Sequence, residues 1–116
     1  MAIYLQGDIV LVPFPFSDEP TETKARPAII ISNSTVNKTA DVILAQITST
    51  IRADEFSFLI DDKNVQTKLH NICEVRCHKL FTAQKSIIKK KISALKVDKY
   101  KDLKVIIDRV LAYQQP

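Results

Sequence analysis

Glycine is almost missing from this 116-residue sequence, in which Gly7 is the only example. Loops that cradle a phosphate, and the sharp turn that carries the serine nucleophile of α/β-hydrolases, need several glycines at fixed spacing. The sequence contains neither motif. Tryptophan is also absent, and no apolar run approaches the roughly 20 residues that span a bilayer. These absences argue against nucleotide-binding loops, that class of hydrolase and any membrane partner.

Cysteine is limited to Cys73 and Cys77. If residues 71–80 form a strand, both thiols lie on one face with Cα atoms roughly 13 Å apart. That separation is too large for a disulfide, so we expect reduced, core-facing thiols of the kind found in cytoplasmic proteins. The first residues lack the basic start and apolar stretch of a signal peptide. We therefore expect a soluble cytoplasmic protein.

Zinc is the alternative use of these cysteines, because His70 and His78 lie near them in the sequence. Strand alternation, however, places His78 on the opposite face from both cysteines. A tetrahedral zinc site needs ligands that converge. We expect no metal and no cofactor.

Positive charge is concentrated toward the C-terminus. Residues 79–116 hold ten Lys/Arg and three Asp (+7), whereas residues 1–78 hold seven Lys/Arg and ten Asp/Glu (−3). A basic region suits a polyanion such as RNA or DNA, although a solvated lysine-rich surface has the same composition. The run Lys89–Lys91 is open to both interpretations, as a track for a nucleic-acid backbone or as a solvated turn.

Short β-rich runs separated by polar segments fill most of the chain. Strands are expected at 8–14, 27–32, 41–48, 56–60, 71–80 and 89–95. The acidic segment 17–24 is expected to be a mobile loop that orders when a ligand binds. Apolar residues at three- and four-residue steps predict an amphipathic helix within 97–115, with Asp98 as its N-cap. The sequence predicts a mainly β (β+α) fold in one domain, 1–116, built as a small barrel closed by this helix.

Polar side chains stand at the ends of three predicted strands. Arg26 precedes Pro27 where the polar segment meets a buried strand, and Thr48 ends the run 41–48. In the next strand, alternation puts Glu74, Arg76 and His78 in a row on the face opposite the cysteines.

These groups suit the cleavage of an RNA phosphodiester. The ribose 2′-OH can attack the adjacent phosphate, so the protein need supply neither nucleophile nor metal. Arginine forks bind phosphate oxygens and stabilise charge that develops on them. Histidine titrates near neutrality and suits proton transfer. Taken singly, each residue is equally typical of an ordinary exposed strand end, so spacing alone leaves the function open.

Three motifs in order resemble those of the MazF/PemK/Kid family, the toxins of type II toxin–antitoxin pairs. They are "GDIVLVPFPFSD" followed by "RPAIIIS", then "LAQITS", then "VRCHKLFTA". The resemblance implies an SH3-like barrel, a homodimer, and metal-independent endoribonuclease activity on single-stranded mRNA. It implies products with 2′,3′-cyclic phosphate and 5′-OH ends. It also implies a cognate antitoxin that covers the RNA groove, with DNA reached only through that antitoxin.

The resemblance also suggests roles for individual residues. Arg26 would stabilise the phosphate, the Thr48 hydroxyl would donate to it, and Arg76 would act as an acid or a phosphate clamp. The expected contacts along the RNA groove are Asp8, Ser17, Lys24, Ser49, Phe56 and Glu74. Glu74 has an alternative role, which is to hold Arg76 in place.

One residue departs from the family pattern: His78 stands where relatives have aspartate. Our hypothesis is that His78 is the general base, alone or together with Arg26, because an imidazole pKa lies nearer neutrality than that of a carboxylate. Two other functions fit the same barrel. One is a non-catalytic module that binds nucleic acid or protein, and the other is a gyrase-poisoning toxin. The combination of Arg26, Thr48 and Arg76 in motif context favours the endoribonuclease.

Overall fold

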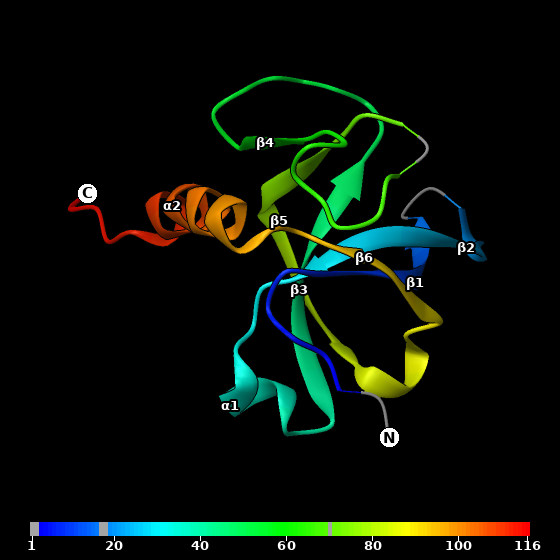
Figure 1. Ribbon diagram of the computed structural model, residues 1–116. Helices are drawn as coiled ribbons and strands as arrows, with labels where there is room; N and C mark the ends of the chain where they lie inside the picture. Colours follow the sequence, from blue (N-terminus) through cyan, green and yellow to red (C-terminus); the bar gives the residue numbers. More distant parts are fainter. Residues whose placement is uncertain (1–2, 17–18, 70) are drawn as a thin grey trace.

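A single antiparallel sheet and a C-terminal helix make up the computed structural model, which describes residues 3–16, 19–69 and 71–116, without the side chains of 14–16 and 19–23 (Figure 1). The strands are β1 (Asp8–Phe16), β2 (Glu19–Ile30), β3 (Asp41–Thr48), β4 (Ser57–Ile60), β5 (Cys73–Gln84) and β6 (Lys90–Ala94). The helices are α1 (Ser34–Asn37), the 3₁₀ turn η1 (Lys85–Ile87) and α2 (Val97–Leu111). The described strands form one six-stranded sheet in the order β4-β5-β3-β2-β1-β6.

The sheet curves into a half-barrel rather than a closed barrel. Its outermost strands, β4 and β6, are not neighbours in the described sheet. The loop after β4 spans part of the opening, where Val65 forms an isolated bridge with Leu95. Two backbone hydrogen bonds flank that bridge, from Gln66 to Ala94 and from Lys96 to Asn64, both 2.8 Å long. The expectation of a mainly β fold with a C-terminal helix is confirmed, while the idea of full closure is corrected.

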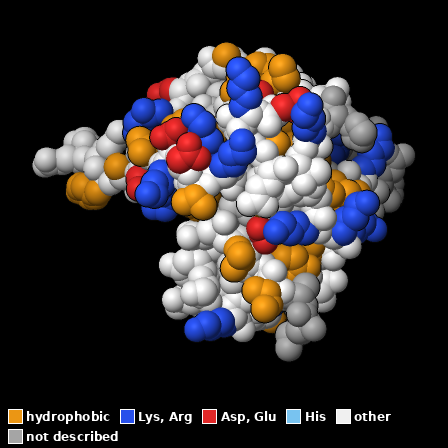
Figure 2. Space-filling view, in the orientation of Figure 1, with side chains coloured by type: hydrophobic (Ala, Val, Ile, Leu, Met, Phe, Trp, Pro, Cys, Tyr) orange, Lys and Arg blue, Asp and Glu red, His pale blue; other side chains and the backbone are white. Residues whose placement is uncertain are grey.

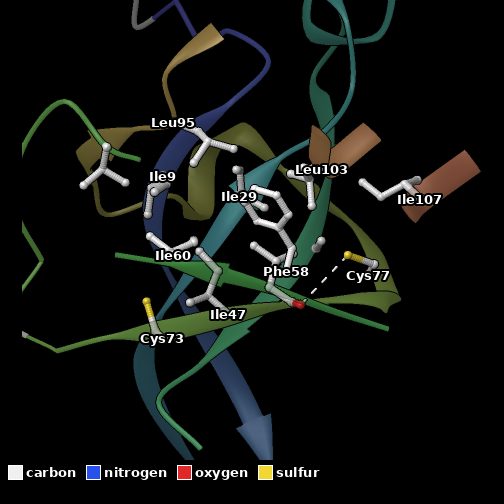
Figure 3. Packing of buried hydrophobic residues seen from close by; sticks show 13 residues of the cluster. Ile9, Ile29, Ile47, Phe58, Ile60, Cys73, Cys77, Leu95, Leu103 and Ile107 are labelled. Carbon is white, nitrogen blue, oxygen red and sulfur yellow. Dashed lines mark hydrogen bonds between the residues drawn. The ribbon is translucent and has the colours of Figure 1, made fainter. Parts of the chain in front are cut away.

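Both faces of the sheet are buried, which explains why its strands read as nearly continuous apolar runs. One face packs against α2, and Figure 3 shows Leu103 and Ile107 of that helix close to side chains of the sheet such as Ile29. The other face carries a second cluster that includes Val10 and Leu44, and partly buried Tyr4 and Phe81 pack against it. Each fully buried aliphatic side chain contributes about 1.5–3 kcal/mol by leaving water.

The cysteines lie where alternation placed them. Cys73 and Cys77 are both free and buried among the residues that pack against α2. Burial raises the pKa of each thiol to about 11. Both are therefore neutral core groups near physiological pH.

Two local expectations are wrong. The segment 17–24 was expected to be a loop, but β2 begins at Glu19 because the chain there pairs with β1, for example Lys24 with Phe14. Pairing with a neighbouring strand overrides the weak β propensity of such polar residues. Asp98 does not cap α2. Lys96 occupies the N-cap without a side-chain hydrogen bond, and Asp98 lies in the first turn, where its charge favours the helix dipole.

Candidate functional site

A cavity of about 710 Å³ opens where two central strands stop pairing. The hydrogen-bonded ladder between β2 and β3 ends, in the described chain, at the pair Ala28–Gln46. Arg26 and Thr48 lie two residues beyond that pair, and both line the cavity. Further lining residues used below are Ser49, Thr50, Lys68, Asn71, Cys73 and Lys90. The cavity thus exists because the sheet leaves these strand ends apart.

Each side of the cavity is positioned by a different part of the fold. Arg26 pairs with Val12 of β1, which fixes its backbone while its side chain stays exposed. Thr48 is the last residue of β3, and its hydroxyl accepts a hydrogen bond of 3.1 Å from the Thr50 backbone N–H. Lys68 belongs to the loop that the Val65–Leu95 bridge holds against the end of β6.

The charge of the cavity is positive. Arg26, Lys68 and Lys90 contribute three cations, and the described lining residues include no Asp, Glu or His. Hydroxyls of Thr48 and Ser49 add neutral hydrogen-bond donors. Such a lining attracts an anion of extended shape and offers it both point charges and an arginine fork.

A metal has no comparable place in the described chain. Among the residues described, His, Cys, Asp and Glu form no group of three or more that could hold an ion. Cys73 lines the cavity, but its raised pKa makes it a poor thiolate ligand. His70, the nearest histidine in sequence, falls outside the described residues.

Arg76 does not line the cavity; it is buried in a second polar cluster on β4 and β5. Its Nη1 and Nη2 atoms donate to both oxygens of Asp54, at 3.0 and 2.9 Å. Nη1 also donates to Glu74 at 2.6 Å and to the Ser57 hydroxyl at 2.8 Å. The guanidinium is only 5% exposed, so two carboxylates surround a cation that bulk water hardly reaches.

Glu74 anchors the β3–β4 loop, which we define as residues 49–56. One of its carboxylate oxygens accepts backbone N–H bonds from Arg52 (2.9 Å) and Ala53 (3.2 Å), and the other accepts from Ser57. Burial by itself would raise the pKa of Glu74, but hydrogen bonds from Ser57, Arg76 and the loop backbone outweigh it and lower that pKa. Hydrogen bonding to Arg76 likewise lowers the pKa of Asp54 well below its usual range.

His78 and Phe56 form a stacked pair away from the cavity. Their ring centroids are 4.3 Å apart and the planes differ by 29°. His78 is exposed and Phe56 half-buried. Neither lines the cavity that holds Arg26 and Thr48.

The structure thus separates the residues that the sequence had grouped. It brings together Arg26, Thr48 and Ser49, and it collects Glu74 and Arg76 elsewhere with Asp54. Lys24 is exposed on β2 without lining the cavity, and Ser17 falls outside the described residues. Asp8 is buried near the N-terminus, where it accepts from the Leu5 N–H and pairs with Lys91 at 3.2 Å.

Sequence reasoning missed Lys68, Asn71, Asp54 and Ser57. Lys68 and Asn71 lie in a loop whose position depends on a bridge to β6, almost 30 residues later in the chain. Nothing local signals that contact. Asp54 carried a weak signal, because an Asp three residues before a Ser often makes a turn of the kind seen here, with its carboxylate accepting from the Phe56 N–H.

The basic C-terminal region carries acidic side chains among its lysines and arginines on the surface of α2. Figure 2 shows acidic side chains beside Lys and Arg over α2, whose acidic residues are all Asp. Lys104 and Asp108 form an ion pair of 2.6 Å on this helix. The helix therefore presents a mixed, solvated face, and the cations that line the cavity come from β2, β6 and the loop before β5. In the described chain, no helix is long and apolar enough to cross a membrane.

Comparison with known proteins agrees with this architecture. Residues 5–111 match the sequence model of a family described as PemK-like, MazF-like toxin of type II toxin-antitoxin system. Because that match covers most of the sequence, the chain belongs to this toxin family. None of the curated proteins compared with it by sequence matches the chain.

Solved structures share the fold at low sequence identity. A mycobacterial endoribonuclease in complex with its cognate antitoxin is 18% identical, with a TM-score of 0.78 over 97% of this chain and 99% of that one. The toxin MazF-mt6 from Mycobacterium tuberculosis is 21% identical, with a TM-score of 0.73 over 93% and 99%. MazF in a MazE–MazF structure from Deinococcus radiodurans is 14% identical, with a TM-score of 0.78 over 98% and 100%.

Proposed function

We propose that this toxin is a metal-independent endoribonuclease that cleaves single-stranded mRNA. The observation that carries the proposal is the meeting of Arg26, Thr48 and Ser49 in one cavity with the cations Lys68 and Lys90. An RNA backbone supplies the anion that this lining suits. Family membership and the endoribonucleases among the similar structures support the same activity.

The reaction follows from the chemistry of RNA. The 2′-oxygen gives its proton to water and bonds to the adjacent phosphorus, the bond from phosphorus to the 5′-oxygen breaks, and the 5′-oxygen takes up a proton from water. The products are a 2′,3′-cyclic phosphate and a 5′-hydroxyl. In this scheme the Arg26 guanidinium and the Thr48 hydroxyl donate to the oxygens on which negative charge develops. Ser49 and Lys68 hold the neighbouring phosphates.

The proton acceptor for the 2′-OH is not among the described lining residues, which provide donors instead. The earlier assignment of His78 as base lacks support from geometry, because its ring stacks on Phe56 outside the cavity. In our proposal the exposed His78 ring, supported by the half-buried Phe56, is a platform on which a base of the bound RNA stacks. Asp8 and Lys24 are left without a direct role in the cavity.

The partners follow from the same cavity. We propose that a cognate antitoxin places an acidic segment over Arg26, Lys68 and Lys90 and excludes RNA by competing for these cations. The mycobacterial complex with a cognate antitoxin and the MazE–MazF structure support a protein partner of this kind. We further propose a homodimer that acts in the cytoplasm, where mRNA and a reduced Cys73 and Cys77 coexist, and that reaches DNA only through the antitoxin.

The decisive experiment is a cleavage assay on single-stranded RNA in EDTA, with end-group analysis of the fragments. Wild type would be compared with Arg26→Ala and with Arg52→Ala. The second variant is a matched control, because Arg52 is exposed and does not line the cavity. We expect cyclic phosphate ends from wild type and Arg52→Ala, and a loss of about 10²–10³-fold in Arg26→Ala.

Other outcomes would change the assignment. RNA binding without any cleavage would indicate a non-catalytic module on the same barrel. Growth inhibition without RNA cleavage, together with inhibited DNA supercoiling, would indicate a gyrase-poisoning toxin. Equal losses in both variants would show that Arg26 acts only through net charge.

A further inference from the structure

We infer that Asp54 is a positioning residue for the proposed reaction, and that it acts by locking Arg76 against the β3–β4 loop that carries Ser49 and Thr50. Arg76 then serves the loop rather than the phosphate. This inference rests on the proposed endoribonuclease function for its catalytic consequence, but its structural part can be tested without RNA.

The residues that line the cavity continue along the chain into the β3–β4 loop. Thr48, Ser49 and Thr50 line the cavity, and the chain runs from them directly into Arg52 and Ala53. The backbone N–H groups of Arg52 and Ala53 both donate to the same carboxylate oxygen of Glu74. The lining residues and the anchored residues therefore belong to one short segment, whose conformation is shared.

The β3–β4 loop depends on its hydrogen bonds to Glu74. Ala53 adopts a φ of 50°, in the left-handed region that residues other than glycine rarely occupy. Such a backbone persists only where surrounding contacts hold it. The contact on Ala53 is the hydrogen bond to Glu74. The next residue, Asp54, donates its N–H to the Ser57 hydroxyl, and its carboxylate accepts from the Phe56 N–H.

Asp54 and Glu74 are both held in place by the guanidinium of Arg76. Arg76 bridges them, with two bonds to Asp54 and one to Glu74. Glu74 is 1% exposed and Arg76 5%, whereas the Asp54 side chain is 40% exposed. Asp54 is therefore the accessible end of a buried network, and it can be changed without opening the core.

The surroundings of the Arg76 guanidinium decide whether it could also bind a phosphate. The Nε of Arg76 is the one buried side-chain nitrogen or oxygen in the described residues without a hydrogen-bond partner. That atom is shielded from solvent, and the Nη atoms face Asp54. A phosphate could reach this guanidinium only by displacing Asp54, whereas Arg26 is already exposed at the cavity. The geometry favours Arg26 as the phosphate ligand and Arg76 as its support.

The test compares Asp54→Asn with Glu55→Gln. Both changes remove one negative charge from neighbouring positions of the loop, but the Glu55 side chain is exposed and its backbone oxygen alone accepts a bond, from Arg109. The structural readout is amide hydrogen exchange at Arg52 and Ala53 in the protein alone. We expect exchange to rise about tenfold or more in Asp54→Asn and to stay at the wild-type rate in Glu55→Gln.

The catalytic readout separates kcat from KM on a short single-stranded RNA. For Asp54→Asn we expect kcat to fall about tenfold with KM little changed, and we expect Asp54→Glu to recover part of the loss. A lower KM or a higher kcat in Asp54→Asn would overturn the inference, because it would show that Asp54 masks a phosphate site on Arg76. Unchanged amide exchange would overturn it as well.

These readouts distinguish two kinds of failure. If the wild-type protein cleaves no RNA, the proposed function fails, while amide exchange still decides whether Asp54 positions the loop. Arg76→Ala is a poor substitute, because it would leave Glu74 buried without its cation. Combining Arg76→Lys with Asp54→Asn gives a double-mutant cycle instead. Additive exchange effects in that cycle would contradict a coupled pair.

Discussion

Gln46 of β3 pairs with Arg76 of β5, but the preceding residue of β3, Ala45, pairs with Leu80. Three residues of β5, at positions 77–79, are therefore skipped by the ladder, an irregularity larger than the single extra residue of a common β-bulge. At this point the Cys77 N–H bonds instead to the Phe56 carbonyl. His78 lies in this irregular stretch, exposed and stacked on Phe56, and this explains why regular strand alternation, which groups His78 with Arg76, fails here.

His78→Ala should weaken RNA binding without changing the pH dependence of cleavage. The ring stacks on Phe56 outside the cavity, so its loss removes a stacking surface worth about 1–3 kcal/mol per base. The measurement is a pH–rate profile of kcat together with KM. Disappearance of a limb near pH 6–7 in the variant would restore His78 as the general base. Phe56→Ala is the companion variant and should raise KM in the same way.

Thr48→Val should lower kcat while leaving the fold intact. The two side chains have similar shape, and the change removes only the hydroxyl that we assign to the phosphate. We expect a loss of about 10- to 10³-fold in kcat, and recovery of most activity in Thr48→Ser, which restores the donor. Full activity in Thr48→Val would show that the hydroxyl only caps the Thr50 N–H.

Lys68→Ala should reduce the salt dependence of RNA affinity. Each phosphate that a protein neutralises on a single strand contributes about −0.7 to the slope of log K against log salt concentration. Binding isotherms at several salt concentrations would therefore show a slope smaller in magnitude by about 0.7. Lys101→Ala is the control, since Lys101 is exposed on α2 and does not line the cavity. An equal change in both variants would indicate general electrostatic attraction.

Glu74→Ala should destabilise the protein severely, by about 3–5 kcal/mol, because Arg76 would remain buried beside a missing partner. The measurement is the free energy of unfolding from urea titration at neutral pH. A loss below about 1 kcal/mol, the range of exposed pairs, would contradict a buried network. Ser49→Ala, at an exposed cavity position, is a suitable control.

Low pH should destabilise the protein by protonating the carboxylates of Glu74 and Asp54. The pKa values of Glu74 and Asp54 are lower in the folded protein than in the unfolded chain. Their ionisation therefore adds stability that is fully present above the unfolded values, near pH 4, and is lost as pH falls through the folded ones. Unfolding free energy should decline below about pH 5. In Glu74→Gln this decline should be shallower.

Sequence patterns predicted the strands and the helix well where the apolar period was clear. The limits of β3, Asp41–Thr48, agree with the expected run, and α2, Val97–Leu111, lies within the expected run 97–115 although it starts before the expected cap. The sequence failed where a distant contact decides the structure. Glu19 and its neighbours are strand because β1 pairs with them, and α1 forms in a segment that reads as a turn.

The candidate site was predictable in part for the same reason. Arg26 and Thr48 stand at the ends of apolar runs, which are visible in the sequence, and the motif resemblance singled them out; in the structure Thr48 ends β3, whereas β2 continues past Arg26 to Glu19. Lys68 reaches the cavity only through the bridge between Val65 and Leu95. Asp54 approaches Arg76 only because the β3–β4 loop folds back over β5. Neither of these two contacts produces a periodic pattern in the sequence.

The cavity lies where the ladder between β2 and β3 runs out, and this separates chemistry from stability. Strand interiors that hold the sheet together end at Ala28 and Gln46, while Arg26 and Thr48 extend past the last pair. Both residues stay paired on their other side, Arg26 with Val12 and Thr48 with Glu74, so their backbones hold the sheet while their side chains line the cavity. The site is therefore preformed: two strands that part from each other, while each stays paired to its outer neighbour, present the side chains from a frame that is already in place before any ligand arrives.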